Sequence, residues 1–344
     1  MVSTRDVPLP SLNHQFTLAA RPVGLPKLSD FRLVEVPIPA IEADQVLVRT
    51  LYLSVDPYMR GRISGVKSYA DPYDVGQVIV GGALGKVLQS TSPKFQPGEI
   101  VHGMWGWQEF AVVPAERVRK LDAHQAPIST ALGVLGMPGM TAYFGFLEIC
   151  RPQPRETLVV SGAAGAVGSL VGQLGRIAGC RVVGIAGSDD KVTWLTGELG
   201  FDAAFNYKTA ADYVAKLQEL CPRGVDCYFD NVGGAISDAV FLVLNTKARA
   251  AICGQISQYN ESAPPPGSHI LRQLLWRQAR AEGFLVHEYQ KRWPEGISQM
   301  AQWIREGKLE YREHVVEGFA NTPAAFIGML QGENSGKMLV KVAD

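Results

Sequence analysis

The residues best suited to bind a ligand are the glycines of one turn. The pattern Ala163-x-Gly165-x-x-Gly168 matches G-x-G-x-x-G except that alanine stands first. An apolar segment at residues 158–160 precedes the turn, and a helical segment at 169–178 follows it. In such a turn the backbone approaches a pyrophosphate, which accepts hydrogen bonds from N–H groups at the start of the helix. Taken alone, the pattern fits an ordinary strand-to-helix turn equally well.

A pyrophosphate at this turn would belong to a dinucleotide, and a second indication concerns the ribose of that dinucleotide. Domains that bind NAD usually end their second strand with an acid that holds the ribose 2′-OH. Here the segment 181–186 is followed by Gly187, so no carboxylate stands there to repel a 2′-phosphate, and Lys191 comes four residues later. The alternative is that Ser188 and the two aspartates after it cap a helix, with Lys191 a solvated surface charge. The sequence alone leaves both readings open.

These residues need an alternation of strands and helices to position them. Further strand-like segments lie at residues 181–186, 203–206, 225–230, 249–253 and 281–287, with helical segments between them. Strands separated by helices form a parallel sheet that is covered on both faces. We therefore predict an α/β fold with a Rossmann domain, a doubly wound parallel sheet. Ligands are expected beyond the carboxyl ends of its strands.

The chain before residue 121 has a different pattern. Short β-type segments interrupted by Pro and Gly predict a small antiparallel barrel there. These segments are residues 31–36, 45–53, 77–90, 100–105 and 109–114. After residue 307 come a β-like segment (309–316), a short helix (322–330) and a last strand (337–342). The simplest arrangement is a discontinuous first domain, residues 1–130 and 307–344, with residues 131–306 as the second domain.

Composition excludes several function classes. The 344 residues carry 33 Lys plus Arg and 33 Asp plus Glu, so the formal net charge is zero. Without a basic tract, nothing supports binding of nucleic acid or of a membrane surface. The first residues lack the apolar core of a signal peptide, which leads us to expect a cytoplasmic protein. The five cysteines are scattered without C-x-x-C spacing, as expected for reduced thiols and not for a zinc site.

Motifs spread over nearly the whole chain resemble one known family. They include Leu53-Ser-Val-Asp-Pro-Tyr-Met-Arg60, Gly136-Met-Pro-Gly-Met-Thr-Ala-Tyr143, Tyr228-Phe-Asp-Asn-Val-Gly-Gly234 and Cys253-Gly-Gln-Ile-Ser-Gln-Tyr-Asn260. They resemble the zinc-independent branch of the medium-chain dehydrogenase/reductase superfamily, with its prostaglandin reductases, plant double-bond reductases and bacterial curcumin reductases. The resemblance implies a GroES-like β-barrel catalytic domain beside the Rossmann domain, NADPH as cofactor, and commonly a homodimer. Zinc-dependent relatives carry a cysteine ligand near Leu53–Asp56, and this chain has none there, so no metal is expected.

The resemblance also implies a reaction and a residue for it. The family reduces the carbon–carbon double bond of α,β-unsaturated aldehydes and ketones. Hydride reaches the β-carbon, and the negative charge that develops on the carbonyl oxygen needs a hydrogen-bond donor. Tyr259 matches the residue with this role, alongside the nicotinamide ribose hydroxyl. Without the motif, Tyr259 would read as a half-buried loop tyrosine.

The cofactor and substrate contacts implied by motif and position form a larger set. In the family a lysine and a tyrosine at the positions of Lys191 and Tyr207 contact the 2′-phosphate, whereas an inward carboxylate of Asp189 or Asp190 would weaken that contact. The candidates for cofactor binding are Met137, Thr141, Ala163, Gly165, Ala166, Val167, Gly187, Ser188, Lys191, Tyr207, Asn231, Cys253, Gly254, Tyr259, Phe284, Val286 and Asn334. The candidates for substrate contact are Tyr52, Tyr58, Tyr73 and Trp107, for which packing is the alternative.

Two other functions compete with enone reduction. A quinone reductase of the same superfamily would use the same cofactor site with a different acceptor. A non-catalytic NADPH-binding protein would keep the fold and the glycine turn without turnover, because a fold alone does not secure a function.

Overall fold

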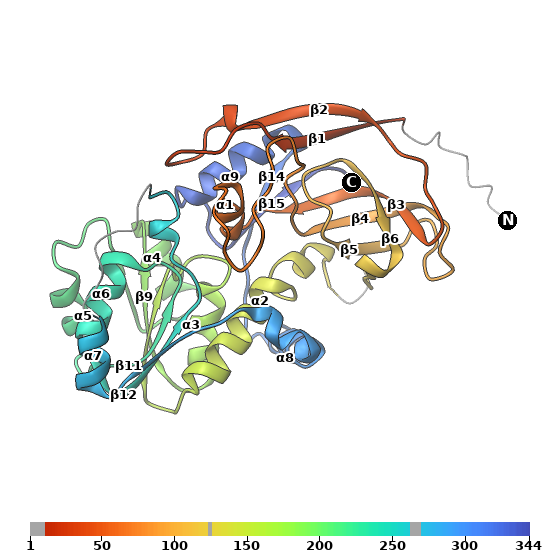
Figure 1. Cartoon of the computed structure of the whole chain (residues 1–344). Coiled ribbons are helices and arrows are strands. Elements are labelled where there is room, and N and C mark those ends of the chain that lie inside the picture. Colours follow the sequence, from red (N-terminus) through yellow and green to blue (C-terminus); the bar gives the residue numbers. More distant parts are fainter. Residues whose placement is uncertain (1–10, 123–125, 262–269) are drawn as a thin grey trace. The chain divides into compact units, whose positions relative to one another are not determined.

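The structure is a computed structural model that describes residues 11–122, 126–261 and 270–344 (Figure 1). Helices and strands occur along the whole described chain, which confirms the predicted α/β class. Two compact units are present. The first comprises Met1–Leu132, Val315–Met329 and Leu339–Asp344, and the second comprises Gly133–His314 and Leu330–Met338. The predicted domain boundaries stay a prediction; in the observed division, Leu330–Met338 belongs with the second unit.

Antiparallel strands dominate the first unit. β1 (Leu12–Leu18) pairs with β2 (Phe31–Pro37), and the larger sheet has the order β14-β15-β3-β4-β5-β7, with β6 on β3. Its strands are β3 (Gln45–Ser54), β4 (Ala83–Ser90), β5 (Ile100–Gly103), β6 (Phe110–Pro114), β7 (Val118–Lys120), β14 (Glu313–Glu317) and β15 (Lys337–Lys341). The helices of this part are α1 (Tyr58–Ile63) and α9 (Thr322–Leu330).

Several predicted strands of this unit have different bounds. The segment 77–90 forms a strand only from Ala83, because Gly81 and Gly82 interrupt it and bring the backbone close to Met59 and Leu132. The predicted strand at 309–316 begins only at Glu313. β1 was not predicted, because its polar residues hide the strand pattern. Asn13, for example, is buried and donates to the carbonyl of Phe110 (2.7 Å).

The second unit contains a six-stranded parallel sheet within the described residues. Its order is β10-β9-β8-β11-β12-β13, the order of a Rossmann sheet. The strands are β8 (Thr157–Ser161), β9 (Arg181–Ala186), β10 (Ala203–Asn206), β11 (Val225–Asp230), β12 (Leu244–Ile252) and β13 (Arg280–Gly283). Every pairing between neighbours is parallel. The predicted strand 281–287 is wrong beyond Gly283, since Val286–Arg292 forms a 3₁₀ helix.

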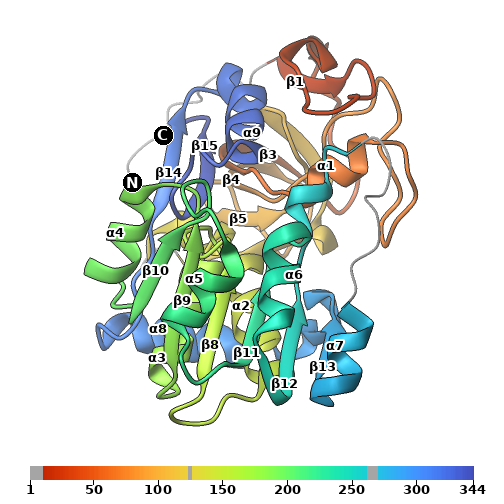
Figure 2. The same cartoon turned by 90° about the vertical axis from the view of Figure 1, so that its left-hand side faces the viewer.

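Helices cover both faces of this sheet (Figure 2). Successive strand residues alternate between two apolar clusters: Leu158 and Val160 join one, and Val159 joins the other. The first cluster includes residues of α2 (Met137–Phe144), α3 (Gly168–Ile177), α4 (Asp189–Gly197) and α8 (Trp293–Arg305). The second includes residues of α5 (Tyr213–Leu220), α6 (Gly234–Leu242) and α7 (Ile270–Arg277). A sheet buried on both faces leaves its strand ends as the accessible edges.

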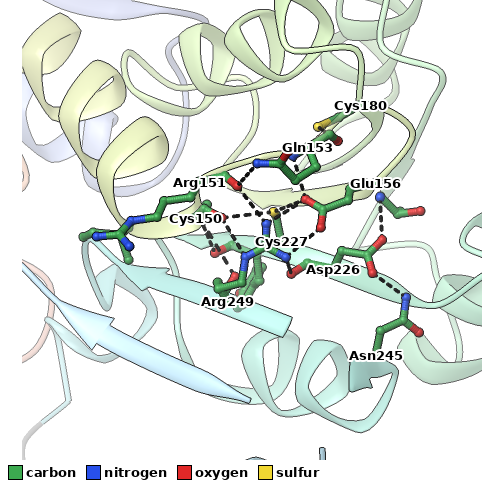
Figure 3. Close-up of polar contacts among 12 residues, drawn as sticks. Cys150, Arg151, Gln153, Glu156, Cys180, Asp226, Cys227, Asn245 and Arg249 are labelled. Carbon is green, nitrogen blue, oxygen red and sulfur yellow. Dashed lines mark hydrogen bonds and ion pairs between the residues drawn. The ribbon is translucent and has the colours of Figure 1, made fainter. Parts of the chain in front are cut away.

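One edge is closed by an ion pair (Figure 3). Glu156 stands just before β8, and its carboxylate receives two hydrogen bonds from the guanidinium of Arg249 on β12 (2.8 and 2.7 Å). The same guanidinium donates to the carbonyls of Cys150 (2.7 Å) and Arg151 (3.0 Å), at the end of a π-helical segment. These contacts tie the amino edge of the sheet to the segment that leads into it.

No helix among the described residues is long and apolar enough to cross a membrane.

Candidate functional site

The glycine turn lies where predicted, between β8 and α3. Gly162 has a φ of 59°, and a Cβ on Gly168 would lie 2.3 Å from the carbonyl oxygen of Gly162. The turn therefore requires glycine at both positions, and α3 can start directly against it. Ala163 is buried, whereas Gly165, Ala166 and Val167 are partly exposed ahead of the helix. The N–H groups of a first helical turn have no intrahelical acceptor, so the turn presents donors to an anion.

Another part of the chain lies against this turn. The N–H of Gly336 donates to the carbonyl of Ala164 (2.8 Å), and Gly165 pairs with Gly336 in a single β-bridge. Asn334, two residues earlier, donates from its side chain to the carbonyl of Gly336 (2.7 Å). The fold thus brings Asn334, a predicted cofactor contact, to the glycine turn, where it also stabilises its own loop.

The predicted phosphate residues meet at the ends of β9 and β10. A Cβ on Gly187 would lie 3.1 Å from the Tyr207 ring, so glycine lets the tyrosine lie against the backbone. Ser188 caps α4 by accepting from the N–H of Lys191 (3.4 Å), as the alternative reading expected. Lys191 is nevertheless no solvated charge: it is partly buried and its Nζ donates to the carbonyl of Gly332 (2.5 Å).

Positive charge gathers beside Lys191. Burial lowers the pKa of its ammonium, and the charge of nearby Lys208 lowers that pKa further. The carboxylate of Asp189 accepts from the side-chain amide of Asn206 (2.9 Å). Lys208 was not singled out by the sequence, although it follows Tyr207 directly. The pair of cations forms a place where an anion would relieve mutual repulsion.

The end of β11 carries a buried carboxylate. Asp230 is fully buried, and the next residue, Asn231, donates from its backbone and its side chain to Ser161 at the end of β8 (2.9 and 2.8 Å). The N–H groups of Cys253 and Gly254 donate to the carbonyl of Asp230 (2.8 and 3.1 Å). The ends of three neighbouring strands are thereby joined around Asn231.

Tyr259 lies just beyond β12, with its hydroxyl against the backbone. Its Oη accepts from the N–H of Gln255 (3.3 Å). A Cβ on Gly254 would lie 3.2 Å from this oxygen and 3.3 Å from the carbonyl of Asn231, so glycine makes room for the phenol. Burial raises the pKa of Tyr259 above its ordinary value of 10, although the Gln255 hydrogen bond opposes this. The phenol therefore stays protonated at neutral pH and keeps a proton to donate.

Four predicted cofactor contacts lie on α2 or after β13. Met137 begins α2, and Thr141 donates to its carbonyl (2.8 Å) from within that helix. Phe284 packs edge-to-face on Phe229 (6.2 Å between centroids) and stays partly exposed, whereas Val286 is buried, so its backbone groups remain for a ligand.

The predicted substrate contacts belong to the first unit. Tyr58 begins α1, and its surroundings include Tyr73; burial raises the pKa of both phenols, that of Tyr73 to about 12. Tyr52 packs on an apolar cluster that includes Leu84. Trp107 is fully buried, and its ring contacts the rings of Phe16, Phe31 and Phe326. Full burial favours a packing role for Trp107 and Tyr73 in this unit.

Sequence reasoning missed the residues that support the site. Asp230 and Gln255 stand in motifs that were recognised, and Ser161 lies just before the glycine turn, but no role was assigned to these residues. The available signal was a charged residue that ends an apolar strand, because an acid is rarely buried there without partners. Their partners lie far apart in sequence, and only the folded chain shows them.

Comparison with known proteins places both parts of the chain. Residues 14–121 match the family described as N-terminal domain of oxidoreductase, and residues 166–302 match the family described as zinc-binding dehydrogenase. Among the described residues, no three His, Cys, Asp or Glu side chains gather as a metal site.

Relatives match over the full length. The Bacillus subtilis protein YfmJ is 51% identical, and the match covers 96% of this chain and 98% of YfmJ. The NADPH-dependent curcumin reductase of Escherichia coli is 44% identical, over 96% and 97%. The tobacco NADP(+)-dependent 2-alkenal reductase is 43% identical, over 96% and 98%. The crystal structure of CurA from Vibrio vulnificus in complex with NADPH superimposes with a TM-score of 0.93 at 45% identity, over 96% and 99%.

Proposed function

This chain belongs to the zinc-independent branch of the medium-chain dehydrogenase/reductase superfamily, and from that premise we propose that it reduces the carbon–carbon double bond of α,β-unsaturated aldehydes or ketones with NADPH. The observation that carries the proposal is a protonated, partly buried phenol, Tyr259, at the same sheet edge as the glycine turn. An oxidoreductase that binds NADPH there would have a hydrogen-bond donor close to the reacting atoms.

The residues present fit NADPH. Gly162 and Gly168 permit a turn whose exposed N–H groups suit a pyrophosphate. Gly187 places no carboxylate beside the ribose, while Lys191 and Lys208 supply two cations for a 2′-phosphate. Asp189 accepts a hydrogen bond from the side-chain amide of Asn206, which orients its carboxylate but leaves the negative charge in place. The backbone groups of Asn231, Cys253, Gly254 and Phe284 are candidates to hold the nicotinamide.

The reaction asks little covalent chemistry of the protein. When bound, the nicotinamide supplies the hydride. Tyr259 would donate its hydroxyl proton in a hydrogen bond to the carbonyl oxygen of the substrate, where charge develops as the β-carbon is reduced. Because its own oxygen already accepts from Gln255, the hydroxyl hydrogen is free to point at the substrate. The α-carbon can take its proton from water, so no side chain needs to act as a general acid.

Family membership supports the rest of the proposal. The antiparallel unit would be the GroES-like catalytic domain, with Tyr52 and Tyr58 as substrate contacts, whereas the fully buried Tyr73 and Trp107 would have a packing role. A homodimer and a cytoplasmic location belong to the same proposal.

NADPH oxidation followed by absorbance tests the function. The acceptors are a short alkenal, a bulky diarylenone, a quinone and a saturated aldehyde, each also with NADH. We expect turnover with the enones, a saturated carbonyl product, and a strong preference for NADPH. Turnover confined to the quinone would instead indicate a quinone reductase, and tight NADPH binding without oxidation by any acceptor would indicate a binding protein.

Two variants assign the residues. Tyr259→Phe should lower kcat about 100-fold, the usual effect of removing one oxyanion donor. Lys191→Ala should raise the KM for NADPH roughly tenfold or more and leave the KM for NADH nearly unchanged, since it removes a charged hydrogen bond to the 2′-phosphate. Lys216→Ala, on the exposed Lys216–Glu219 pair, is the matched control.

A further inference from the structure

The carboxylate of Asp230 accepts six hydrogen bonds, and every donor is neutral. Oδ1 accepts from the hydroxyls of Ser161 (2.8 Å) and Tyr228 (2.7 Å) and from the N–H groups of Val232 (3.0 Å) and Gly233 (2.9 Å). Oδ2 accepts from the hydroxyl of Ser237 (2.8 Å) and the side-chain amide of Gln255 (3.1 Å). A carboxylate is acceptor-only, so it can satisfy all these donors at once, which an amide cannot.

The two oxygens hold different parts of the unit. The donors to Oδ1 come from β8, from β11 and from the loop directly after it. The donors to Oδ2 come from α6, through Ser237, and from the segment that leads to Tyr259, through Gln255. Asp230 thus links the sheet edge to the segment that leads to Tyr259 through a single side-chain contact, the one with Gln255.

Gln255 connects Asp230 to the phenol. Its side-chain Nε2 donates to Asp230 and to the carbonyl of Gly254 (3.1 Å), while its backbone N–H donates to Tyr259 Oη (3.3 Å). The space around it is tight: a Cβ on Gly233 would lie 2.1 Å from Gln255 Oε1. The amide of Gln258 also donates to that oxygen (3.3 Å). With Oε1 engaged on this side, the amide of Gln255 is oriented with its Nε2 toward the carboxylate.

We propose that Asp230 is a positioning residue for Tyr259, which it places by fixing Gln255 so that the backbone N–H of Gln255 holds the phenol oxygen. The inference rests on the proposed function, because it gives Tyr259 the donor role. Asp230 itself is buried behind the loop and acts through Gln255. The chain of contacts determines the direction of the Tyr259 hydroxyl and therefore the rate of the step that it assists.

A reciprocal exchange tests this contact. Asp230→Asn keeps the shape but turns an amide toward the amide of Gln255, so two donors face each other. We expect kcat to fall about tenfold, the effect of losing one hydrogen bond to a charged group, with the KM for NADPH changed less than about threefold. Gln255→Glu added to Asp230→Asn restores a donor and an acceptor, with the polarity reversed, and should recover most of kcat. Gln255→Glu alone places two carboxylates against each other, and its kcat should stay low.

Controls separate positioning from folding. Ser237→Ala removes the other donor to Oδ2 and leaves the Gln255 contact intact, so kcat should stay within about twofold. Gln255→Leu removes the contact while the carboxylate remains, and it serves if Asp230→Asn does not fold. Loss of kcat equal in Ser237→Ala and Gln255→Leu, or no recovery in the double exchange, would overturn the proposal.

A double-mutant cycle distinguishes this proposal from the proposed function. In a Tyr259→Phe background, Asp230→Asn should lower kcat no further, because the phenol it positions is gone. If Tyr259→Phe has a low kcat and adding Asp230→Asn lowers that kcat by the same further factor as in wild type, the positioning role is wrong and the proposed function stands. If Tyr259→Phe keeps full kcat on enones, the donor role fails, and this inference fails with it.

Discussion

The two edges of the parallel sheet each contain an acid in a dense polar network, but the acids are balanced differently. At the amino edge, Glu156 is paired with the guanidinium of Arg249, which also ties down two carbonyls (Figure 3). At the carboxyl edge, Asp230 is held by neutral hydroxyls, amides and N–H groups. The network of Glu156 is therefore an ion pair neutralised within itself, whereas the network of Asp230 extends to the loops that follow the strands.

This difference matches what each edge has to do. A guanidinium bound to a carboxylate neutralises both charges and engages their hydrogen-bonding groups. The amino edge is therefore rigid and leaves none of these groups for a ligand. Neutral donors around Asp230 order the backbone of Asn231 and the approach to Tyr259, where ligands of such sheets bind. We expect changes at the amino edge to alter stability, and changes at the carboxyl edge that displace Asn231 or Gln255 to alter kinetics.

The largest effect should come from breaking the amino-edge ion pair. Arg249→Met leaves the partly buried Glu156 without its cation, which we expect to lower the free energy of unfolding by about 3 kcal/mol. At 25 °C, kcat and the KM for NADPH should stay unchanged. Urea unfolding and steady-state turnover measure the two. Arg292→Met is the control, because Arg292 pairs with Glu148 and Glu295 at the exposed surface and should matter less. A fall in kcat would contradict the division between the edges.

A smaller effect is expected at the carboxyl edge. Ser161→Ala removes a donor to Asp230 (2.8 Å) and the acceptor for the N–H of Asn231 (2.9 Å). We expect a loss of roughly 1–2 kcal/mol in the free energy of unfolding. In contrast to Arg249→Met, a several-fold rise in the KM for NADPH should accompany it. Thr196→Ala, which removes a hydroxyl from the exposed side of α4, should change neither quantity. Unchanged kinetics in Ser161→Ala would weaken the contrast.

The pH dependence of the ion pair sharpens the comparison. Burial alone would raise the pKa of Glu156, but hydrogen bonds from Arg249 and from the N–H of Gln153 outweigh it and hold the pKa below 4.5. A carboxyl group with a lowered pKa in the folded state contributes stability above pH 4.5 and loses it as the pH falls through the folded-state pKa. In Arg249→Met, the hydrogen bond from the N–H of Gln153 still opposes burial but the arginine no longer does, so protonation of Glu156 becomes more favourable.

The stability difference between wild type and Arg249→Met should therefore shrink as the pH falls from 7 to below 4.5. Urea midpoints at a series of pH values measure this difference. A gap that stays constant over the whole range would show that Glu156 is not the group the arginine neutralises.

The smallest effect concerns the thiols at both edges. Burial raises the pKa of Cys180 at the amino edge and of Cys253 at the carboxyl edge, each to about 12, and that of Cys221 to about 11. Only the thiolate is reactive, so a thiol-specific disulfide reagent at pH 8 should label native protein hardly at all. All five cysteines should react after unfolding. Rapid labelling of one thiol in the native protein would identify an edge that opens.

Local patterns in the sequence predicted the frame of the second unit. The segments 181–186, 203–206 and 225–230 coincide with β9, β10 and β11, because β-branched and aromatic residues in short buried strands are a local property. The glycine turn was predictable for the same reason: Gly168 must lie against Gly162, and both belong to one short stretch. Tyr259 was predicted from a resemblance of motifs, and Lys191 from its position after Gly187 together with that resemblance; the roles of both remain proposals.

Long-range partners could not be predicted. β1 has the polar sequence of a loop. Its Asn13 is buried because Gln108 and Phe110, which come 95 and 97 residues later in the chain, fold against it and accept its hydrogen bonds. Arg249 reads as an ordinary strand residue until Glu156, 93 residues earlier, lies beside it.

By itself the sequence determined the alternation of strands and helices in the second unit, the glycine turn, and the glycine that stands directly after β9 where an acid would bind a ribose. Only the tertiary structure decided which hydrogen-bond donors pair with which buried acceptors. Asp230 collects donors from Ser161, 69 residues before it, and from Gln255, 25 residues after it. The physical reason is that a strand or turn is set by neighbours along the chain. A buried charge is tolerated only once distant segments have folded around it and its hydrogen bonds have formed.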